Sequence, residues 1–146
     1  MLLISHRGNL SGPNLEQENS EPYIMAAISA GFDVETDLWG DDSGQIYLGH
    51  DRPTYKTSSE FLSAQKDKLW IHCKNLKVLD LISGQVGFNY FWHQTDDYTL
   101  TSKGYIWTYP GKLVLGKNIL VVWERLAKDK LPNCLGICSD YVNDYK

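Results

Sequence analysis

Apolar side chains recur along the chain with two different periods, and each period marks one type of secondary structure. Ile24, Ala27 and Ile28 are three or four positions apart, which predicts a helix. This helix ends at Gly31, and residues 32–39 then alternate apolar and polar side chains, as a half-buried strand does. The same patterns predict further strands at 2–5, 45–48, 69–74, 88–93, 105–109, 119–123 and 135–138, and further helices at 58–68, 76–82 and 124–130.

Strands and helices alternate through most of the chain, which favours parallel strands joined by helices in one domain over residues 1–146. Polar side chains gather where these strands end. His6, His50 and His93 each follow a predicted strand. Because the carboxyl ends of parallel strands share one edge of a sheet, residues far apart in the sequence should meet there. The sequence therefore predicts one functional site at that edge.

The composition excludes several classes of protein. Hydrophobic residues make up 42% of the chain and charged residues 22%, which is typical of a globular protein rather than a disordered one. The net charge is −4 and no basic cluster is present, so no nucleic-acid partner is expected. Every apolar run is shorter than the length of about eighteen residues that a membrane-spanning helix needs, and no secretory signal is recognisable. Three cysteines without zinc-like spacing indicate free thiols, and we expect a cytoplasmic protein.

Glu35 and Asp37 are the most informative pair in the sequence. They lie two positions apart in a predicted strand, so both carboxylates point to the same face. Two such carboxylates repel each other unless a cation or a shared proton lies between them, and oxygen ligands suit Mg²⁺ or Ca²⁺. The alternative is a strand whose carboxylates face solvent while Val34 and Thr36 pack on the other side.

The pairs His6-Arg7 and His50-Asp51 each follow a predicted strand. The planar guanidinium of Arg7 suits phosphate oxygens, and His6 can transfer protons near neutral pH. His50 is a second candidate acid or base, with Asp51 as the group that orients its ring. Each pair also has a purely structural interpretation, which is a solvated strand end for Arg7 and a loop turn for Asp51.

His72 and Lys74 lie on one face of an otherwise apolar strand. A buried ammonium group needs an anionic partner, which is either a substrate phosphate or the carboxylates of Glu35 and Asp37. His72 is either a metal ligand or a core histidine with satisfied hydrogen bonds. Farther along the chain, His93 and Trp107 are candidates for lining a pocket, although aromatic residues at such positions are more often part of the core.

The order of these segments resembles the glycerophosphodiester phosphodiesterase family, within the wider group of phospholipase C-like phosphodiesterases. The matching segments are SHRGN at 5–9, ENS at 18–20, GFDVETDLW at 31–39, GQIYLGHD at 44–51, LWIHCKN at 69–75, YIWTY at 105–109 and GICSDY at 136–141. The resemblance implies a barrel enzyme that hydrolyses phosphodiesters. It also implies roles for individual residues: His6 and His50 as general acid and base, Glu35 and Asp37 as metal ligands, Arg7 and Lys74 as phosphate ligands, and Trp107 in the substrate pocket.

Two departures from the family pattern change these expectations. His72 stands where family members usually carry a glutamate that is the third metal ligand, and a neutral imidazole favours Mn²⁺ or Zn²⁺ over Mg²⁺ or Ca²⁺. The chain is also far shorter than the about 250 residues of a full (βα)₈ barrel. The expected fold is therefore a trimmed TIM-like (βα) barrel with fewer and shorter helices. A homodimer would cover strands that lack a helix.

The sequence thus predicts a metal-dependent phosphodiester hydrolase whose substrate is a small molecule of the glycerophosphodiester type. Two other functions stay open at this point. One is a non-catalytic barrel that binds a phosphate or sugar phosphate, and the other is a sugar-phosphate isomerase or aldolase. The presence of both His6 and His50 favours catalysis, because binding alone needs no acid–base pair.

Overall fold

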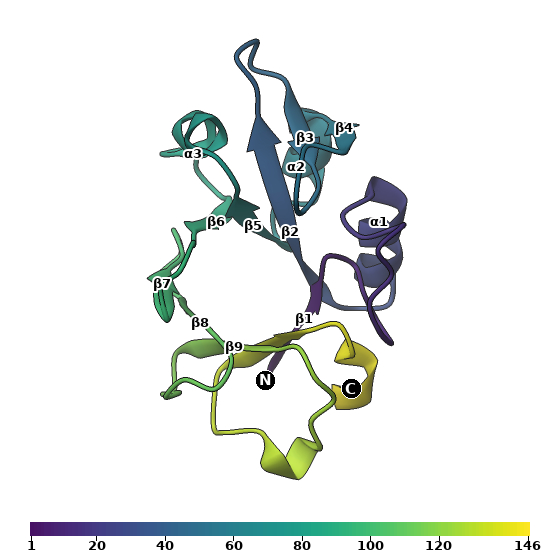
Figure 1. Ribbon diagram of the computed structural model, residues 1–146, viewed down its shortest axis with the longest axis vertical. Coiled ribbons are helices and arrows are strands. Elements are labelled where there is room, and N and C mark those ends of the chain that lie inside the picture. The colour runs from purple at the N-terminus through teal and green to yellow at the C-terminus, as the bar shows by residue number, and fades with distance from the viewer.

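The computed structural model describes residues 1–146 as ten strands, three α-helices and two short 3₁₀ helices (Figure 1). The strands are β1 (Leu2–His6), β2 (Asp33–Gly40), β3 (Ile46–Leu48), β4 (Tyr55–Thr57), β5 (Leu69–Cys73), β6 (Asn89–Trp92), β7 (Tyr98–Leu100), β8 (Ile106–Thr108), β9 (Asn118–Val122) and β10 (Gly136–Ser139). The helices are α1 (Glu21–Ser29), α2 (Ser59–Ala64) and α3 (Leu76–Ile82), and the 3₁₀ helices are η1 (Lys128–Lys130) and η2 (Val142–Tyr145). None of the helices is long and apolar enough to cross a membrane.

All ten strands belong to one curled, mixed sheet that forms a half-barrel. Every pairing in the run β6–β5–β2–β1–β10–β9–β8 is parallel. Strand β7 pairs antiparallel with β8, and β3 and β4 extend β2 as antiparallel strands. The outermost strands β6 and β7 share no ladder. Instead, the backbone N–H of Ser102 donates to the carbonyl of Tyr90 (2.8 Å), and the Ser102 hydroxyl accepts from the Tyr90 N–H (3.0 Å).

The prediction of a trimmed TIM-like barrel is wrong, because α-helices do not alternate with strands around the sheet. All three α-helices lie between β1 and β6 in the chain, and Figure 1 shows them on the side of the molecule that holds β2–β6, with none beside β7–β9. The segment 124–130, predicted as a helix, is irregular apart from η1. Its apolar positions are too few to give a helix a buried face, and the connections after β6 consist of turns and irregular segments that contain Gly104, Pro110 and Gly111.

The outer face of the sheet is covered in two different ways. Around β2 and β5, Val34 and Ile71 belong to one buried cluster with Ile24 of α1 and Val78 of α3. Around β9 and β10 no α-helix is present, and the irregular segment 123–135 together with η2 covers the sheet. The apolar side chains of β9 and β10 are nevertheless buried there. The homodimer was expected to cover exposed strands, and on this side of the sheet the strands are already covered within the chain.

The inner face of the sheet is filled by an apolar layer. Its buried members are Ile4, Trp70, Phe91, Trp107, Ile119, Val121 and Cys138. The rings of Phe91 and Trp107 stack with centroids 4.6 Å apart. Because side chains in a strand alternate between faces, the residue two positions after a layer member points the same way, one step nearer the carboxyl end. Those residues include His6, His72, His93, Tyr109, Trp123 and Asp140. The apolar layer thus supports a second layer of chemically active side chains.

The turn after β1 requires a glycine at position 8. Arg7 (φ 55°) and Gly8 (φ 92°) both have left-handed backbone conformations, which let the N–H of Asn9 donate to the carbonyl of His6 at 2.9 Å. A Cβ atom at Gly8 would lie 2.6 Å from Cδ1 of Tyr23 and 3.2 Å from its backbone. We expect Gly8→Ala to lower the free energy of unfolding by about 2–3 kcal/mol in urea titrations. Gly44→Ala, at φ 81° but in open space, should cost only about 1 kcal/mol; an equal loss would contradict the steric explanation.

The three cysteines are free, as predicted, and they differ in burial. Burial raises the pKa of Cys73 to about 12 and that of Cys138 well above its usual value, whereas Cys134 is partly exposed. Because the thiolate is the reactive form, we expect a chromogenic disulfide reagent to modify only Cys134 in the native protein at mildly alkaline pH. All three thiols should react after denaturation. Cys134→Ser should abolish the native reaction, and a residual fast reaction would show that one of the buried thiols is accessible.

Candidate active site

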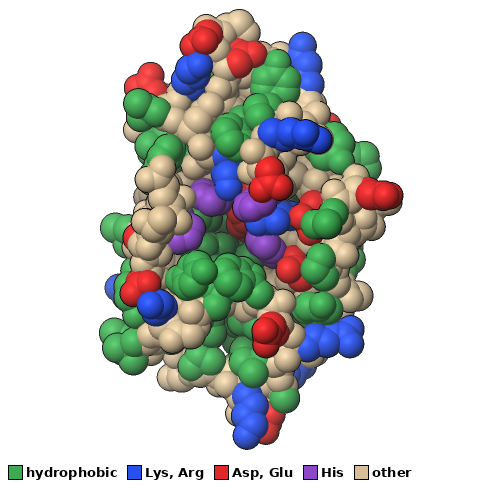
Figure 2. Space-filling view, viewed as in Figure 1, with side chains coloured by type: hydrophobic (Ala, Val, Ile, Leu, Met, Phe, Trp, Pro, Cys, Tyr) green, Lys and Arg blue, Asp and Glu red, His purple; other side chains and the backbone are tan.

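All four histidines of the chain lie around one hollow at the carboxyl ends of the parallel strands. Figure 2 shows histidine side chains gathered in this hollow, with acidic and basic side chains among them. Its polar lining consists of His6, Arg7, Glu35, His50, His72 and His93, and its apolar lining includes Trp107, Tyr109, Pro110, Val121 and Trp123. Lys74 lines an adjoining hollow that shares His50, His72 and His93. The predicted convergence of distant residues on one edge of the sheet is therefore present.

Asp37 is completely buried at the centre of the polar side chains. Its Oδ2 atom lies 3.0 Å from Nδ2 of Asn19, 3.1 Å from Nε of Arg7 and 3.2 Å from Nδ1 of His50. Its Oδ1 atom lies 3.0 Å from Nδ1 of His72 and 3.3 Å from Nζ of Lys74. Burial alone would raise the pKa of Asp37, but contacts with His50 and His72 and the charge of Lys74 hold it well below the usual range. Asp37 is therefore an anion in the folded protein.

Glu35 is almost as buried as Asp37 but has far fewer partners. Its nearest titratable neighbours are Nε2 of His6 at 3.8 Å and Nδ1 of His72 at 3.9 Å, and neither distance is a hydrogen bond. Burial raises the pKa of Glu35, and the charge of Asp37 raises it further. A buried carboxylate without hydrogen bonds is costly, so this position calls for a partner beyond the side chains that surround it.

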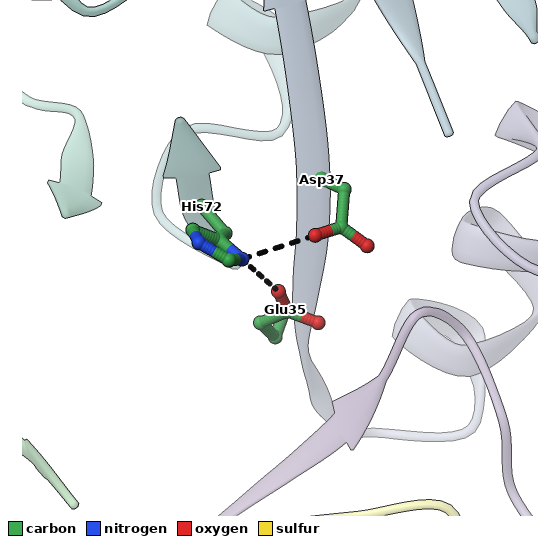
Figure 3. A group of neighbouring side chains, drawn as sticks. All are labelled: Glu35, Asp37 and His72. Carbon is green, nitrogen blue, oxygen red and sulfur yellow. Dashed lines mark ion pairs between the residues drawn. The ribbon is translucent and has the colours of Figure 1, made fainter. Parts of the chain in front are cut away.

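His72 is oriented by a backbone contact that fixes its tautomer. Its Nε2 atom lies 3.1 Å from the carbonyl oxygen of His93, and since a carbonyl only accepts, Nε2 carries the proton. In the neutral ring, Nδ1 then presents a lone pair to the carboxylates of Asp37 and Glu35 (Figure 3). A lone pair facing two carboxylates is repulsive unless a second proton or a metal cation lies between them.

The donor atoms of Glu35, Asp37 and His72 fit a divalent metal ion. One ligand atom from each residue lies within 4.8 Å of the others, and the three side chains point toward one another from β2 and β5 (Figure 3). Oε2 of Glu35 is also a buried atom without a hydrogen-bond partner. Two carboxylates and one imidazole form a donor set that suits Mn²⁺ or Zn²⁺.

His6 is held by a carboxylate from the opposite end of the chain. Its Nδ1 atom donates to Oδ1 of Asp140 at 2.8 Å, and the side-chain amide of Asn9 donates to the same oxygen at 2.7 Å. The Asn9 amide also donates to Glu18 at 2.8 Å, which fixes the amide in place. Burial lowers the pKa of His6, but the hydrogen bond with Asp140 and the charge of Glu35 outweigh it and raise the pKa above its usual value.

His50 is oriented by Asp37 rather than by Asp51. Asp51 is 93% exposed and lies 3.6 Å from Nε2, whereas Asp37 contacts Nδ1 at 3.2 Å. The reason is that the loop after β3 returns to β2, where the N–H of Gly49 donates to the Asp37 carbonyl at 3.2 Å. Nη2 of Arg7 lies 3.2 Å from Nε2 of His50, and a guanidinium only donates. Nε2 of His50 therefore carries a lone pair, and its ring proton is on Nδ1.

Arg7 and Lys74, the predicted phosphate ligands, both reach Asp37 with side chains that are 16% exposed. The left-handed conformation of Arg7 is held by backbone hydrogen bonds to Glu35 at 2.9 Å and from Asn19 at 3.0 Å. Such strain is typical of functional positions. Two cations beside the hollow provide a site to which an anionic ligand would be attracted.

Several residues of the site were not predicted from the sequence. Asn19 was noted as part of the segment 18–20 and not as a site residue, and in the structure its side-chain amide donates to Oδ2 of Asp37 and its oxygen accepts from the Asp37 N–H. Asn9 was noted only as part of a matching segment, and Asp140 as a polar residue at the end of the last predicted strand. Nothing in their spacing reveals contacts across 131 or 134 positions. Neither protein-family models nor curated proteins match this chain, so the arrangement of its side chains is the basis for a functional assignment.

Proposed function

We propose that this protein is a metal-dependent hydrolase of small-molecule phosphodiesters. The observation that supports it best is that two histidines, each held by a carboxylate, line one hollow together with Arg7. Cleavage of a phosphate ester requires a proton to leave the attacking hydroxyl and another to reach the departing alkoxide. A site that only binds phosphate needs neither His6 nor His50.

The protonation states of the two histidines suggest which proton each one moves. The lone pair on Nε2 of His50 would accept the proton of the attacking hydroxyl, once the ligand has drawn Arg7 away from it. His6, whose pKa is raised, would donate a proton from Nε2 to the leaving oxygen. One phosphorus–oxygen bond forms and one breaks. If the attacking oxygen is a neighbouring hydroxyl of the substrate, a cyclic phosphate forms first and water then opens it.

Arg7 and Lys74 would hold the non-bridging oxygens of the phosphate. Their charges offset the negative charge that increases on these oxygens during attack. A divalent ion held by Glu35, Asp37 and His72 would polarise the same phosphoryl group. The planar guanidinium of Arg7 can donate hydrogen bonds to two phosphate oxygens at once, whereas the ammonium group of Lys74 acts as a single point charge.

The test is hydrolysis of bis(p-nitrophenyl) phosphate and of glycerophosphodiesters with Mg²⁺, Ca²⁺, Mn²⁺ or Zn²⁺. We expect turnover with Mn²⁺ or Zn²⁺ that EDTA abolishes. Lys74→Ala should lose activity, whereas Lys77→Ala, whose surface side chain pairs with Asp42, should retain it. Binding of these diesters without turnover, with every metal, would contradict the proposal and identify a phosphate-binding protein instead.

A further inference from the structure

We propose that one of the two alcohol groups of the substrate carries a flat apolar ring, and that Tyr109 and Trp123 bind this ring. The inference rests on the proposed function, because the ring is placed relative to a phosphate at Arg7 and Lys74. It names the class of substrate: an asymmetric phosphodiester with one aromatic and one polar alcohol.

Tyr109 and Trp123 are large aromatic residues left partly exposed beside a charged site. Their exposed fractions are 37% and 48%, and both line the hollow that contains His6 and Arg7. Neither belongs to the buried apolar layer beneath the hollow. Burying them in that layer would have stabilised the fold, so their position at the rim indicates that they contact something else.

The geometry of the pair suits a flat ring. The two ring centroids lie 5.0 Å apart with the planes at 85°, so one residue presents a face where the other presents an edge. A third ring can stack on the exposed face of one and meet the edge of the other, which are the two arrangements that aromatic groups prefer. Pro110 adds an apolar surface to the same rim, and Figure 2 shows hydrophobic side chains gathered along one edge of the hollow.

A second hollow explains why only one ring is expected. It shares Arg7 and His50 with the first, and its other lining residues are mainly polar, among them Asn19, Arg52 and Thr54. A phosphodiester has two alcohol groups, and a phosphate at Arg7 would direct one toward each hollow. The polar hollow suits a hydroxylated or charged group, and the rim at Trp123 suits the ring.

The experiment compares the binding of three stable diesters that differ in one group: methyl phenyl phosphate, methyl cyclohexyl phosphate and dimethyl phosphate. Dissociation constants come from ¹H–¹⁵N correlation spectra of the whole chain with EDTA present, because the proposed function expects turnover of a diester when Zn²⁺ is bound. We expect the phenyl ester to bind roughly tenfold more tightly than either other ester. The indole N–H signal of Trp123 should shift with the phenyl ester and not with dimethyl phosphate.

Substitutions at the two aromatic residues test whether they cause the preference for the phenyl ester. Trp123→Leu and Tyr109→Leu should bring the phenyl ester to within about twofold of dimethyl phosphate, whose own affinity should not change, whereas Trp123→Phe should keep most of the preference. Tyr98→Leu is the control, because Tyr98 is 42% exposed on β7 and does not line the hollow. Equal binding of the phenyl and cyclohexyl esters, or a preference that survives both leucine variants, would overturn the inference. Failure of the proposed function is a separate result, because it appears as absence of turnover and not as absence of this preference.

Discussion

Glu35→Gln should make the metal-free protein more stable and at the same time weaken its binding of Mn²⁺ or Zn²⁺. The buried carboxylate has no hydrogen bond, and burial and the charge of Asp37 raise its pKa. At neutral pH its ionised form therefore opposes folding, and the neutral amide removes this cost, a gain of about 1–2 kcal/mol in urea titrations. Loss of one ligand should weaken metal binding by at least about tenfold to a hundredfold in calorimetric titrations.

The pH dependence gives this prediction a definite sign. Because the pKa of Glu35 is higher in the folded than in the unfolded state, the native protein binds more protons. Stability of the metal-free wild type should fall as pH rises from the ordinary carboxylate value of 4.5 toward the raised value. The advantage of Glu35→Gln should grow through that range and vanish below it. An advantage independent of pH would contradict the electrostatic cause.

Asp37→Asn is the matched control, because its effect on stability should have the opposite sign. The pKa of Asp37 is lowered in the folded protein, so its charge stabilises the fold at neutral pH and that contribution disappears as pH falls. Asparagine would leave Arg7 and Lys74 without their buried anion, at a cost of about 3 kcal/mol. Glu124→Gln, at an exposed carboxylate, should change neither stability nor metal binding.

His6→Ala should lower kcat for a phosphodiester by about 10³, which is typical of losing a general acid. The more informative variant is Asp140→Asn, which keeps the shape of the side chain and removes its charge. Burial alone lowers the pKa of His6, and the hydrogen bond with Asp140 is the first of the contacts that reverse this. Without that charge, His6 should lose its proton at lower pH, so the alkaline limb of the rate profile should move to lower pH.

The control for this experiment is Asp144→Asn. Asp144 is a nearby carboxylate that pairs with Arg125 at the surface and has no contact with His6. Its replacement should leave the rate profile unchanged. If Asp140→Asn lowers the rate equally at every pH, the aspartate only positions the ring and does not set its protonation state.

The order of strands could be predicted from the sequence because alternation with period two is a local property. Strand β5, for example, combines an apolar pattern with clear ends, and the structure confirms it at Leu69–Cys73. Strands β4 and β7 were missed because their side chains are mostly exposed or half-buried and show no apolar pattern, whereas the equally short β3 and β8 carry buried apolar residues and were predicted. The barrel prediction failed for a different reason. The alternation of strands and helices up to residue 82 was extended to the rest of the chain, where the one predicted helix, at 124–130, does not form.

The part of the candidate site that depends only on which face of a strand each side chain occupies could be predicted from the sequence. Glu35 and Asp37 share a face because they are two positions apart, and the structure places both beside His72. Their partners could not be predicted in this way, because the contact of His50 with Asp37 depends on how the chain returns after β3. The opposite pKa shifts of the two carboxylates arise because burial and the charge of Asp37 dominate at Glu35, whereas contacts with His50, His72 and Lys74 outweigh burial at Asp37. Such differences arise from packing and are absent from the pattern of residues.

The pairing of β1 with β10 has a consequence for the order in which the candidate site is assembled during synthesis. Strand β1 emerges first from the ribosome, but one of its edges can be satisfied only by residues 136–139. Until then it presents unpaired backbone groups of the kind that attract chaperones or other chains. The carboxylate that orients His6 arrives with the same late strand. A nascent chain would therefore bring Glu35, Asp37 and His72 together before Asp140 can orient His6, and the candidate site would be complete only once the sheet has gained its last strand.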